Sequence, residues 1–198
     1  MTETLIVTEL PEHACAAWPA LPRLSPDDYL TQRERVDARG QLVVNLAPSY
    51  RYLSAGYYCS LLAEARSQRV IPSVRTIEDL SRKTLYGLAI QNLPAPAAGS
   101  SHDPPDTHRL VLHSYFGFSS RPEFDELCRR LFERFPAPIL RIELRNGGNW
   151  HVGRLALVPR ARLPESEREV FAQAFQRFVG RRWRRRTRRP NRYRYDLA

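Results

Sequence analysis

The sequence predicts a Rossmann-like α/β first half followed by an α+β second half, and three patterns support this division. A near-continuous apolar run over 41–46 precedes a helical pattern and a second short apolar run, which is typical of a βαβ unit with parallel strands. Apolar and charged residues alternate strictly over 140–145 before Asn146-Gly147-Gly148-Asn149, which predicts an antiparallel hairpin. Between these regions, a stretch rich in Pro, Ala, Gly and Ser predicts a flexible loop.

The predicted organisation has four parts. They are a Rossmann-like half over 1–92, a flexible loop over 93–107, a β-α-β-β-α half over 108–180 and a basic segment over 181–198.

The first half begins with a short buried strand at Leu5-Ile6-Val7. A turn at 25–28 and a short surface helix over 29–39 then lead to Gly40, which releases the chain into the strand at 41–46.

Ser54 is placed to cap the helix after this strand. Helical spacing predicts the buried side of that helix as Tyr58, Leu61, Leu62 and Ala65. The next strand is 69–71, and Thr76 with Asp79 predicts the capped start of a second helix.

The second half opens with a strand over 110–118. Ser120 with Glu123 predicts a capping box, and so does Ser166 with Glu169 before a final helix. The apolar side predicted for the first of these helices is Phe124, Leu127, Cys128, Leu131 and Phe135. That of the final helix is Val170, Phe171, Ala174, Phe175, Phe178 and Val179.

Composition predicts a cytoplasmic globular protein without membrane association. No apolar run reaches the roughly 18–20 residues that span a bilayer, and the N-terminus lacks a signal pattern. The three cysteines, Cys15, Cys59 and Cys128, are widely spaced and odd in number, which predicts buried or free thiols instead of disulfides.

The net charge of +10 is concentrated in the basic segment, where nine arginines stand against Asp196. This segment carries +8 and the rest of the chain only +2. Its arginines alternate with Trp183, Tyr193 and Tyr195, so one hypothesis is a nucleic-acid-binding protein that acts through residues 181–194. The alternative is a solvated extension of the preceding helix.

The loop over 48–56, where a strand meets its helix, carries the most informative chemistry, because α/β sheets bind ligands at such loops. A helix start favours an anion, Arg51 adds a planar fork, and Ser49 and Ser54 offer hydroxyls. Gly56, which has no side chain, would allow a ligand to come close to the backbone. The alternative is a tightly packed turn with a solvated Arg51, in which the partly buried spacers are Tyr50, Tyr52, Tyr57 and Tyr58.

Other motifs are weak. Arg82 and Lys83, at the end of the predicted second helix, suit the helix dipole or face an acidic ligand or partner. The five histidines lack metal-ligand spacing, so we expect no metal site, and no catalytic constellation supports an autonomous enzyme. The candidate ligand- or partner-binding residues are Ser49, Tyr50, Arg51, Tyr52, Ser54, Gly56, Tyr57, Arg82 and Lys83.

One long stretch of the sequence is similar to a known protein family. It comprises Asn45-Leu46, Ser49-Tyr50-Arg51-Tyr52, Gly56-Tyr57-Tyr58, the run 60–66, Val70-Ile71-Pro72-Ser73-Val74 and Thr76-Ile77-Glu78-Asp79-Leu80. On these residues the chain resembles the N-terminal domain of RimK-like ATP-grasp proteins, an RLAN-type domain. Trp18-Pro19 and Asp28-Tyr29-Leu30 are similar too, and 131–138 more loosely.

In that family the domain precedes an ATP-grasp domain, which is similar to ligases that join a carboxylate to an amine through an acyl phosphate. The resemblance therefore implies a non-catalytic accessory or substrate-handling module. ATP and Mg would belong to the ATP-grasp domain, which leaves no cofactor in this chain.

The resemblance also extends to Tyr195-Asp196-Leu197-Ala198, which is similar to the start of the strand that leads into the ATP-grasp domain. We therefore expect an excised or naturally separate domain, with the basic segment as an interdomain connection. The expected partners are an ATP-grasp ligase domain in cis or trans, an anionic small molecule, or a second copy of the chain bound through a core edge exposed near the C-terminus.

Overall fold

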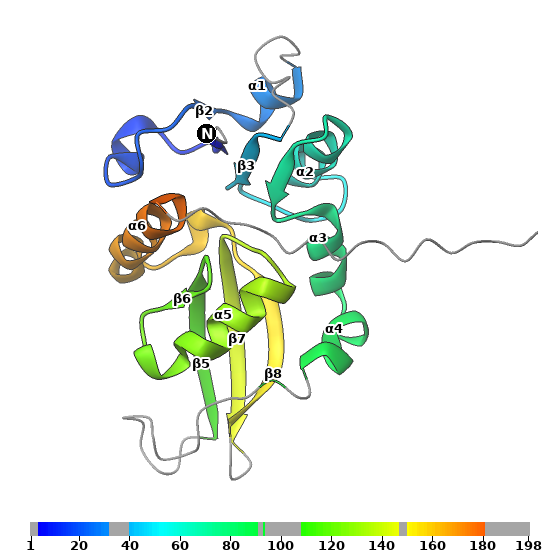
Figure 1. Ribbon diagram of the computed structural model, residues 1–198, viewed down its shortest axis with the longest axis vertical. Helices are drawn as coiled ribbons and strands as arrows, with labels where there is room; N and C mark the ends of the chain where they lie inside the picture. Colours follow the sequence, from blue (N-terminus) through cyan, green and yellow to red (C-terminus); the bar gives the residue numbers. More distant parts are fainter. Residues whose placement is uncertain (1–3, 32–39, 91–92, 94–107, 147–149, 181–198) are drawn as a thin grey trace, which may run out of the picture.

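Two four-stranded sheets, one parallel and one antiparallel, form the framework of the chain (Figure 1). None of the helices in the described part of the chain is long and apolar enough to cross a membrane. The basic segment and nearly all of the predicted flexible loop lie outside that part. The computed structural model describes residues 4–31, 40–90, 93, 108–146 and 150–180.

The first sheet is entirely parallel, with the order β2-β1-β3-β4. Its strands are β1 (Thr4–Val7), β2 (Arg23–Leu24), β3 (Leu42–Asn45) and β4 (Arg69–Ile71). Every residue of β3 is buried, as expected for a parallel strand covered on both faces. The predicted Rossmann-like βαβ unit is confirmed.

The helices of this half start earlier than the sequence predicts in two places. α1 (Pro26–Thr31) begins inside the predicted turn, because the hydroxyl of Ser25 accepts the Asp28 N–H at 3.0 Å and proline fits a first helical turn. α3 (Val74–Ser81) is capped by Ser73 instead of Thr76, whose N–H donates to the Ser73 hydroxyl at 3.1 Å.

α2 (Ala55–Ala65) begins directly after its predicted cap, Ser54. The backbone of Arg82 is extended and ends α3, so α4 (Lys83–Ile90) is a separate helix that is not predicted from the sequence. A short 3₁₀ helix, η1 (Glu12–Cys15), lies between β1 and β2.

The second sheet is antiparallel and has the order β6-β5-β7-β8. Its strands are β5 (Arg109–Tyr115), β6 (Phe118–Ser119), β7 (Ile139–Asn146) and β8 (Trp150–Leu157). Asn146 pairs with Trp150, which confirms the predicted hairpin, while its turn at 147–149 lies outside the described residues. The strand predicted to reach Phe118 instead turns at Phe116 and Gly117.

The helices of the second half are where predicted, but their caps differ. η2 (Pro122–Phe124) precedes α5 (Asp125–Arg134), and η3 (Arg160–Arg162) precedes α6 (Glu165–Gly180). The capping box at Ser120 is wrong, because Glu123 binds Arg121 and α5 begins without a side-chain cap. Ser166 is likewise not a cap, since it lies within α6.

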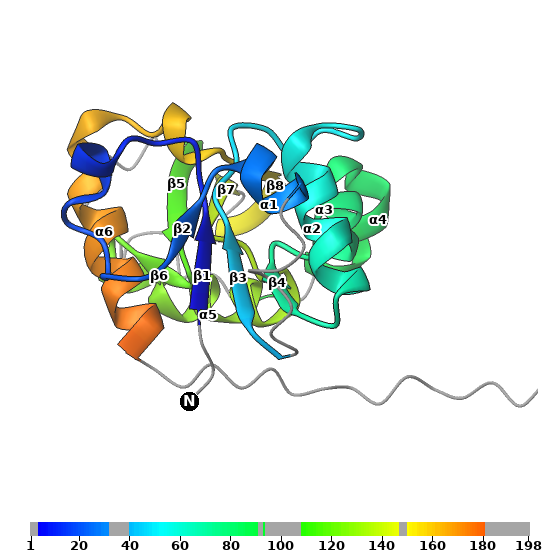
Figure 2. The same cartoon turned by 90° about the horizontal axis from the view of Figure 1, so that it is seen from above.

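The two sheets share a hydrophobic core that is closed by α6. Ile6 and Val44 of the parallel sheet belong to the same buried cluster as Phe116, Phe171 and Phe175. Trp18 meets Phe171 and Phe175 edge-to-face, with ring centroids 5.7 Å apart in both pairs. Figure 2 shows α6 on one side of the strands and α3 with α4 on the other.

A second buried cluster also joins the two halves. It includes Leu131, Phe135 and Ile142 of α5 and β7, together with Leu80 and Tyr86 of α3 and α4. On the first sheet, Tyr29, Val43, Cys59 and Ala63 join α1 and α2 to the strands. The predicted apolar side of α5 is confirmed, and so is most of that of α6, where Val170 and Val179 are half-buried.

Candidate functional site

The loop between β3 and α2 is organised by the side chain of Asn45, which is fully buried at the end of β3. Its Nδ2 donates to the Gly56 carbonyl at 2.7 Å and to the Ser60 hydroxyl at 2.9 Å. Its Oδ1 accepts the Ala47 N–H at 3.1 Å. One amide thus fixes both the exit of the strand and the first turns of α2.

The serines of the loop bind the loop itself. The Ser54 hydroxyl donates to the Ser49 carbonyl at 3.0 Å and accepts the Tyr57 N–H at 3.3 Å, as an N-cap does. The Ser49 hydroxyl accepts the Arg51 N–H at 3.3 Å. These predicted ligand groups therefore have internal partners.

Gly56 and Tyr50 complete this packing. A β-carbon at position 56 would lie 2.2 Å from the Ser49 carbonyl oxygen, so the close approach that requires glycine is made by the chain's own backbone. The Tyr50 hydroxyl donates to the Asn45 carbonyl at 2.8 Å, and burial raises the pKa of Tyr50.

Arg51 is exposed, and no described carboxylate pairs with it. Arg82 and Lys83 are exposed at the junction of α3 and α4, and no hydrogen bond or ion pair among the described residues links them to the loop. The features of the packed turn are therefore present, and an anion contact at Arg51 stays a prediction.

Most of the stripe that spacing assigns to the buried side of α2 faces outward instead, while Leu62 of that stripe packs against the core of the first sheet. Tyr58 is 40% exposed and Leu61 is 43% exposed. The buried side carries smaller residues, Gly56, Cys59, Ser60 and Ala63, together with Tyr57. Both stripes have helical spacing, and the bonds from Asn45 to Gly56 and Ser60 determine which of them faces β3.

Outward-facing apolar side chains therefore gather on the loop and α2. Tyr52 is 74% exposed and Leu53 is 57% exposed, and Leu53 has a φ of 64°. Of the five large hydrophobic side chains that are exposed in the described part of the chain, four lie here. Tyr57 supports them with edge-to-face contacts to Tyr52 and Tyr58, with centroid distances of 5.2 and 5.9 Å.

Beside these residues lies an open groove of about 510 Å³, between α1 and α2. All of its lining is apolar. The groove and its exposed neighbours form what we name the α2 surface: Leu30, Tyr52, Leu53, Tyr58, Leu61, Leu62 and Ala65.

A second polar centre was not predicted. The Nδ1 of His113 lies 2.7 Å from Oε2 of Glu167, and the Tyr115 hydroxyl donates to the same oxygen. Burial raises the pKa of Tyr115, and the Glu167 carboxylate raises it further. Glu167 lies on α6, 54 residues from His113, so no local pattern indicates the pair.

The described residues contain neither a thiol activated for catalysis nor a cluster of metal ligands. All three cysteines are free and buried, and burial raises the pKa of Cys59 to about 12 and that of Cys128 to about 11. No group of three or more His, Cys, Asp or Glu side chains in the described part of the chain could hold a metal ion. The nucleic-acid hypothesis concerns residues 181–194, which lie outside the described part of the chain.

Comparisons with known proteins agree with the resemblance in the sequence. Residues 26–174 match the family described as RimK-like ATPgrasp N-terminal domain. No curated protein matches the chain significantly.

Among solved structures, the ATP-grasp ligase PsnB complexed with a minimal precursor is similar, with 10% identity and a TM-score of 0.53 over 89% of this chain and 99% of that chain. PsnB complexed with the precursor peptide PsnA2 and AMPPNP has 12% identity and a TM-score of 0.50 over 90% and 97% of the two chains. At such identities the likeness is one of fold. Because the family match spans well over half of the residues, the chain belongs to the RimK-like ATPgrasp N-terminal domain family.

Proposed function

We propose that this chain is a non-catalytic accessory module of a RimK-like ATP-grasp carboxylate–amine ligase and contacts the ATP-grasp domain through the α2 surface. The observation that carries the proposal is the concentration of exposed Tyr and Leu side chains on one loop and one helix. ATP and Mg would be bound by the partner domain.

The chemistry of the α2 surface supports an interface with protein. Contiguous exposed apolar groups are unfavourable in water and become favourable when a partner covers them. Aromatic side chains are enriched at interface centres, where they supply much of the binding energy. Tyr52, Tyr58 and Leu61 provide such groups beside an apolar groove.

The internal bonding of the loop supports the same proposal. Asn45, Ser54 and Tyr50 hold the backbone beneath the α2 surface through hydrogen bonds of 2.7–3.3 Å. A surface held in this way loses little conformational freedom when a partner binds, so less binding energy is lost to ordering.

The test is the affinity of this chain for the ATP-grasp domain whose reading frame is fused or adjacent to it, measured by isothermal titration calorimetry. Leu61→Glu places a charge on the apolar contact and should weaken binding at least about 10-fold. Arg130→Ala, on the exposed side of α5, is the matched control and should leave the affinity unchanged. Equal affinities for the Leu61 variant and the original chain would contradict the proposal.

A second copy of the chain is the competing occupant of the α2 surface. Light scattering after size-exclusion chromatography separates the two cases. A monomer in isolation supports the ligase domain as partner, whereas a dimer that Leu61→Glu dissociates would assign the α2 surface to self-association.

Arg51 beside the α2 surface is the proposed contact for an anionic group of the ligase substrate. In the assembled ligase, Arg51→Ala should raise KM for the carboxylate or amine substrate about 10-fold, with kcat unchanged. Arg51→Lys keeps the charge without the fork and should give an intermediate KM. Unchanged kinetics in both variants would remove Arg51 from substrate binding.

A further inference from the structure

Arg160, the first residue of η3, is a buried arginine that has no anionic partner among the residues that the structure describes. It is 6% exposed, and its Nε has no hydrogen-bond acceptor in the described part of the chain. Arg168, the arginine whose charge acts on Arg160, is by contrast paired with Glu165.

The surroundings of Arg160 make an unpaired charge unfavourable. Its guanidinium carbon lies 5.5 Å from the centre of the Phe171 ring, within the core that both sheets share. Burial lowers the pKa of Arg160, and the positive charge of Arg168 lowers it further. A charge taken from water without a partner is strongly destabilising, so this position favours an incoming anion.

Glu167, which binds the neighbouring Tyr115, does not neutralise Arg160. Glu167 makes hydrogen bonds to His113 and Tyr115, and no hydrogen bond or ion pair joins it to Arg160 in the described residues. The neighbouring side chains of Cys15 and Tyr115 are neutral at ordinary pH, because burial raises the pKa of both.

We propose that Arg160 binds a carboxylate, supplied by a small organic acid or by an acidic side chain of a partner protein. A guanidinium matches a carboxylate because both are planar and can form two parallel hydrogen bonds. The Phe171 ring lies against the guanidinium and contributes no hydrogen-bond acceptor, so the Nε–H donor remains for the carboxylate. This site does not depend on the α2 surface.

The experiment measures the nuclear magnetic resonance signal of the Arg160 Nε–Hε group and the Tm of the whole chain. Both are followed during titration with sodium acetate, sodium glutarate and the peptide acetyl-Glu-Glu-Glu-amide. Sodium chloride at equal ionic strength is the reference. Binding should shift the Nε–Hε signal and raise Tm by about 3 °C at ten times Kd. A response to acetate and glutarate alone assigns the site to free organic acids, and a response to the peptide alone assigns it to a protein side chain. A response to all three probes assigns it to the carboxylate group itself.

Two variants test whether the response belongs to Arg160. Arg160→Lys should abolish both effects, since lysine lacks the planar fork. Arg162→Lys alters an exposed arginine of the same short helix and should retain them. If no probe shifts the wild-type signal beyond chloride, or if the Arg160 variant responds as strongly as wild type, the proposal is overturned.

Discussion

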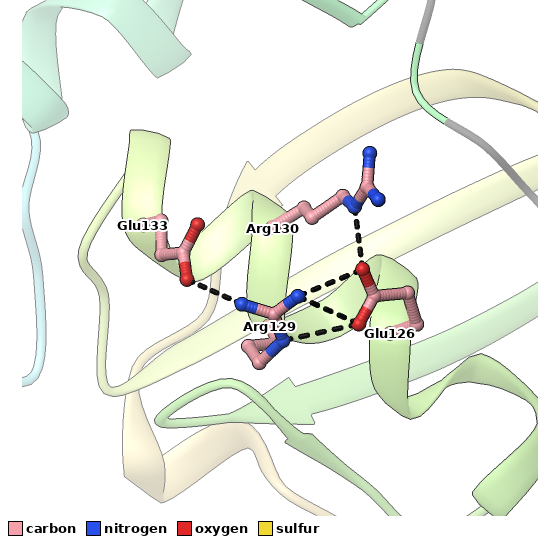
Figure 3. Close-up of polar contacts among 4 residues, drawn as sticks. All are labelled: Glu126, Arg129, Arg130 and Glu133. Atoms are coloured by element: carbon pink, nitrogen blue, oxygen red, sulfur yellow. Dashed lines mark hydrogen bonds and ion pairs between the residues drawn. The ribbon is translucent and has the colours of Figure 1, made fainter.

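The outward sides of α2 and α5 differ in chemistry, although each helix covers one sheet and buries its other side. On α5, Arg129 binds Glu126 at 2.7 Å and Glu133 at 2.6 Å, while Arg130 binds Glu126 at 2.6 Å (Figure 3). The outward side of α2 instead carries apolar residues of the α2 surface.

The outward side of α5 is charged and well suited to contact with water, whereas the outward side of α2 exposes apolar groups. The α5 charges pair along the helix at i,i+3 and i,i+4 spacing, and all four side chains are well exposed to solvent. The exposed apolar groups of α2 have no such pairing, and a covering partner would remove them from water. Because α2 is firmly attached on its inner side, this exposure is not that of a poorly packed helix, which supports the proposed interface.

The largest expected effect tests which leucines belong to the core. Leu131 of α5 is fully buried, so Leu131→Ala should lower the free energy of unfolding by about 2–5 kcal/mol. Leu61→Ala on the α2 surface should change it by less than about 0.5 kcal/mol. Urea unfolding followed by circular dichroism measures both. A similar loss for the two variants would show that Leu61 is a core residue.

The next effect tests how firmly α2 is attached. Gly56→Ala would place a methyl group 2.2 Å from the Ser49 carbonyl oxygen and 2.8 Å from the Ala47 β-carbon, so unfolding should become easier by about 2–3 kcal/mol. Gly87 of α4 has open space around a β-carbon. Gly87→Ala should therefore stabilise the chain by about 0.5–1 kcal/mol. Stabilisation by both substitutions would contradict the close backbone contact beneath α2.

A smaller effect compares the starts of the two helices. Ser54→Ala removes the cap of α2 and should lower the free energy of unfolding by about 1 kcal/mol. The sequence also predicts a cap at Ser120, but α5 begins without a side-chain cap. Ser120→Ala should therefore leave the urea midpoint unchanged, and an equal loss in both variants would mean that α5 is also capped.

Most strands and helices were predictable because their signals are local. The apolar run of β3 and the alternation of β7 identify the strands, and the glycines and asparagines between β7 and β8 predict their hairpin. Cap positions were less predictable, since Ser73 and Thr76 are both acceptable caps and only the structure distinguishes them.

The candidate site was predictable in position but not in its orientation or bonding. The sequence points to the loop after β3, yet it cannot show that the Asn45 amide binds Gly56 and Ser60 and so turns Tyr58 and Leu61 outward. The burial of Arg160 is also invisible in the sequence, because it depends on Phe171 and on packing between the two halves.

The smallest expected effect is the acid sensitivity of the α5 charges. Hydrogen bonds from Arg129 and Arg130 lower the pKa of Glu126 below its usual 4.5. The stabilisation is therefore present above pH 4.5 and is lost as the pH falls through the lower pKa of the folded state. Glu126→Gln should flatten this part of the pH–stability curve. Because the pairs are exposed, 0.5 M salt, with a screening length of ~4 Å, should reduce the slope of the wild type. Leu61→Gln on α2 should leave the curve parallel to wild type. An acid slope that neither Glu126→Gln nor salt alters would mean that this network contributes nothing to stability.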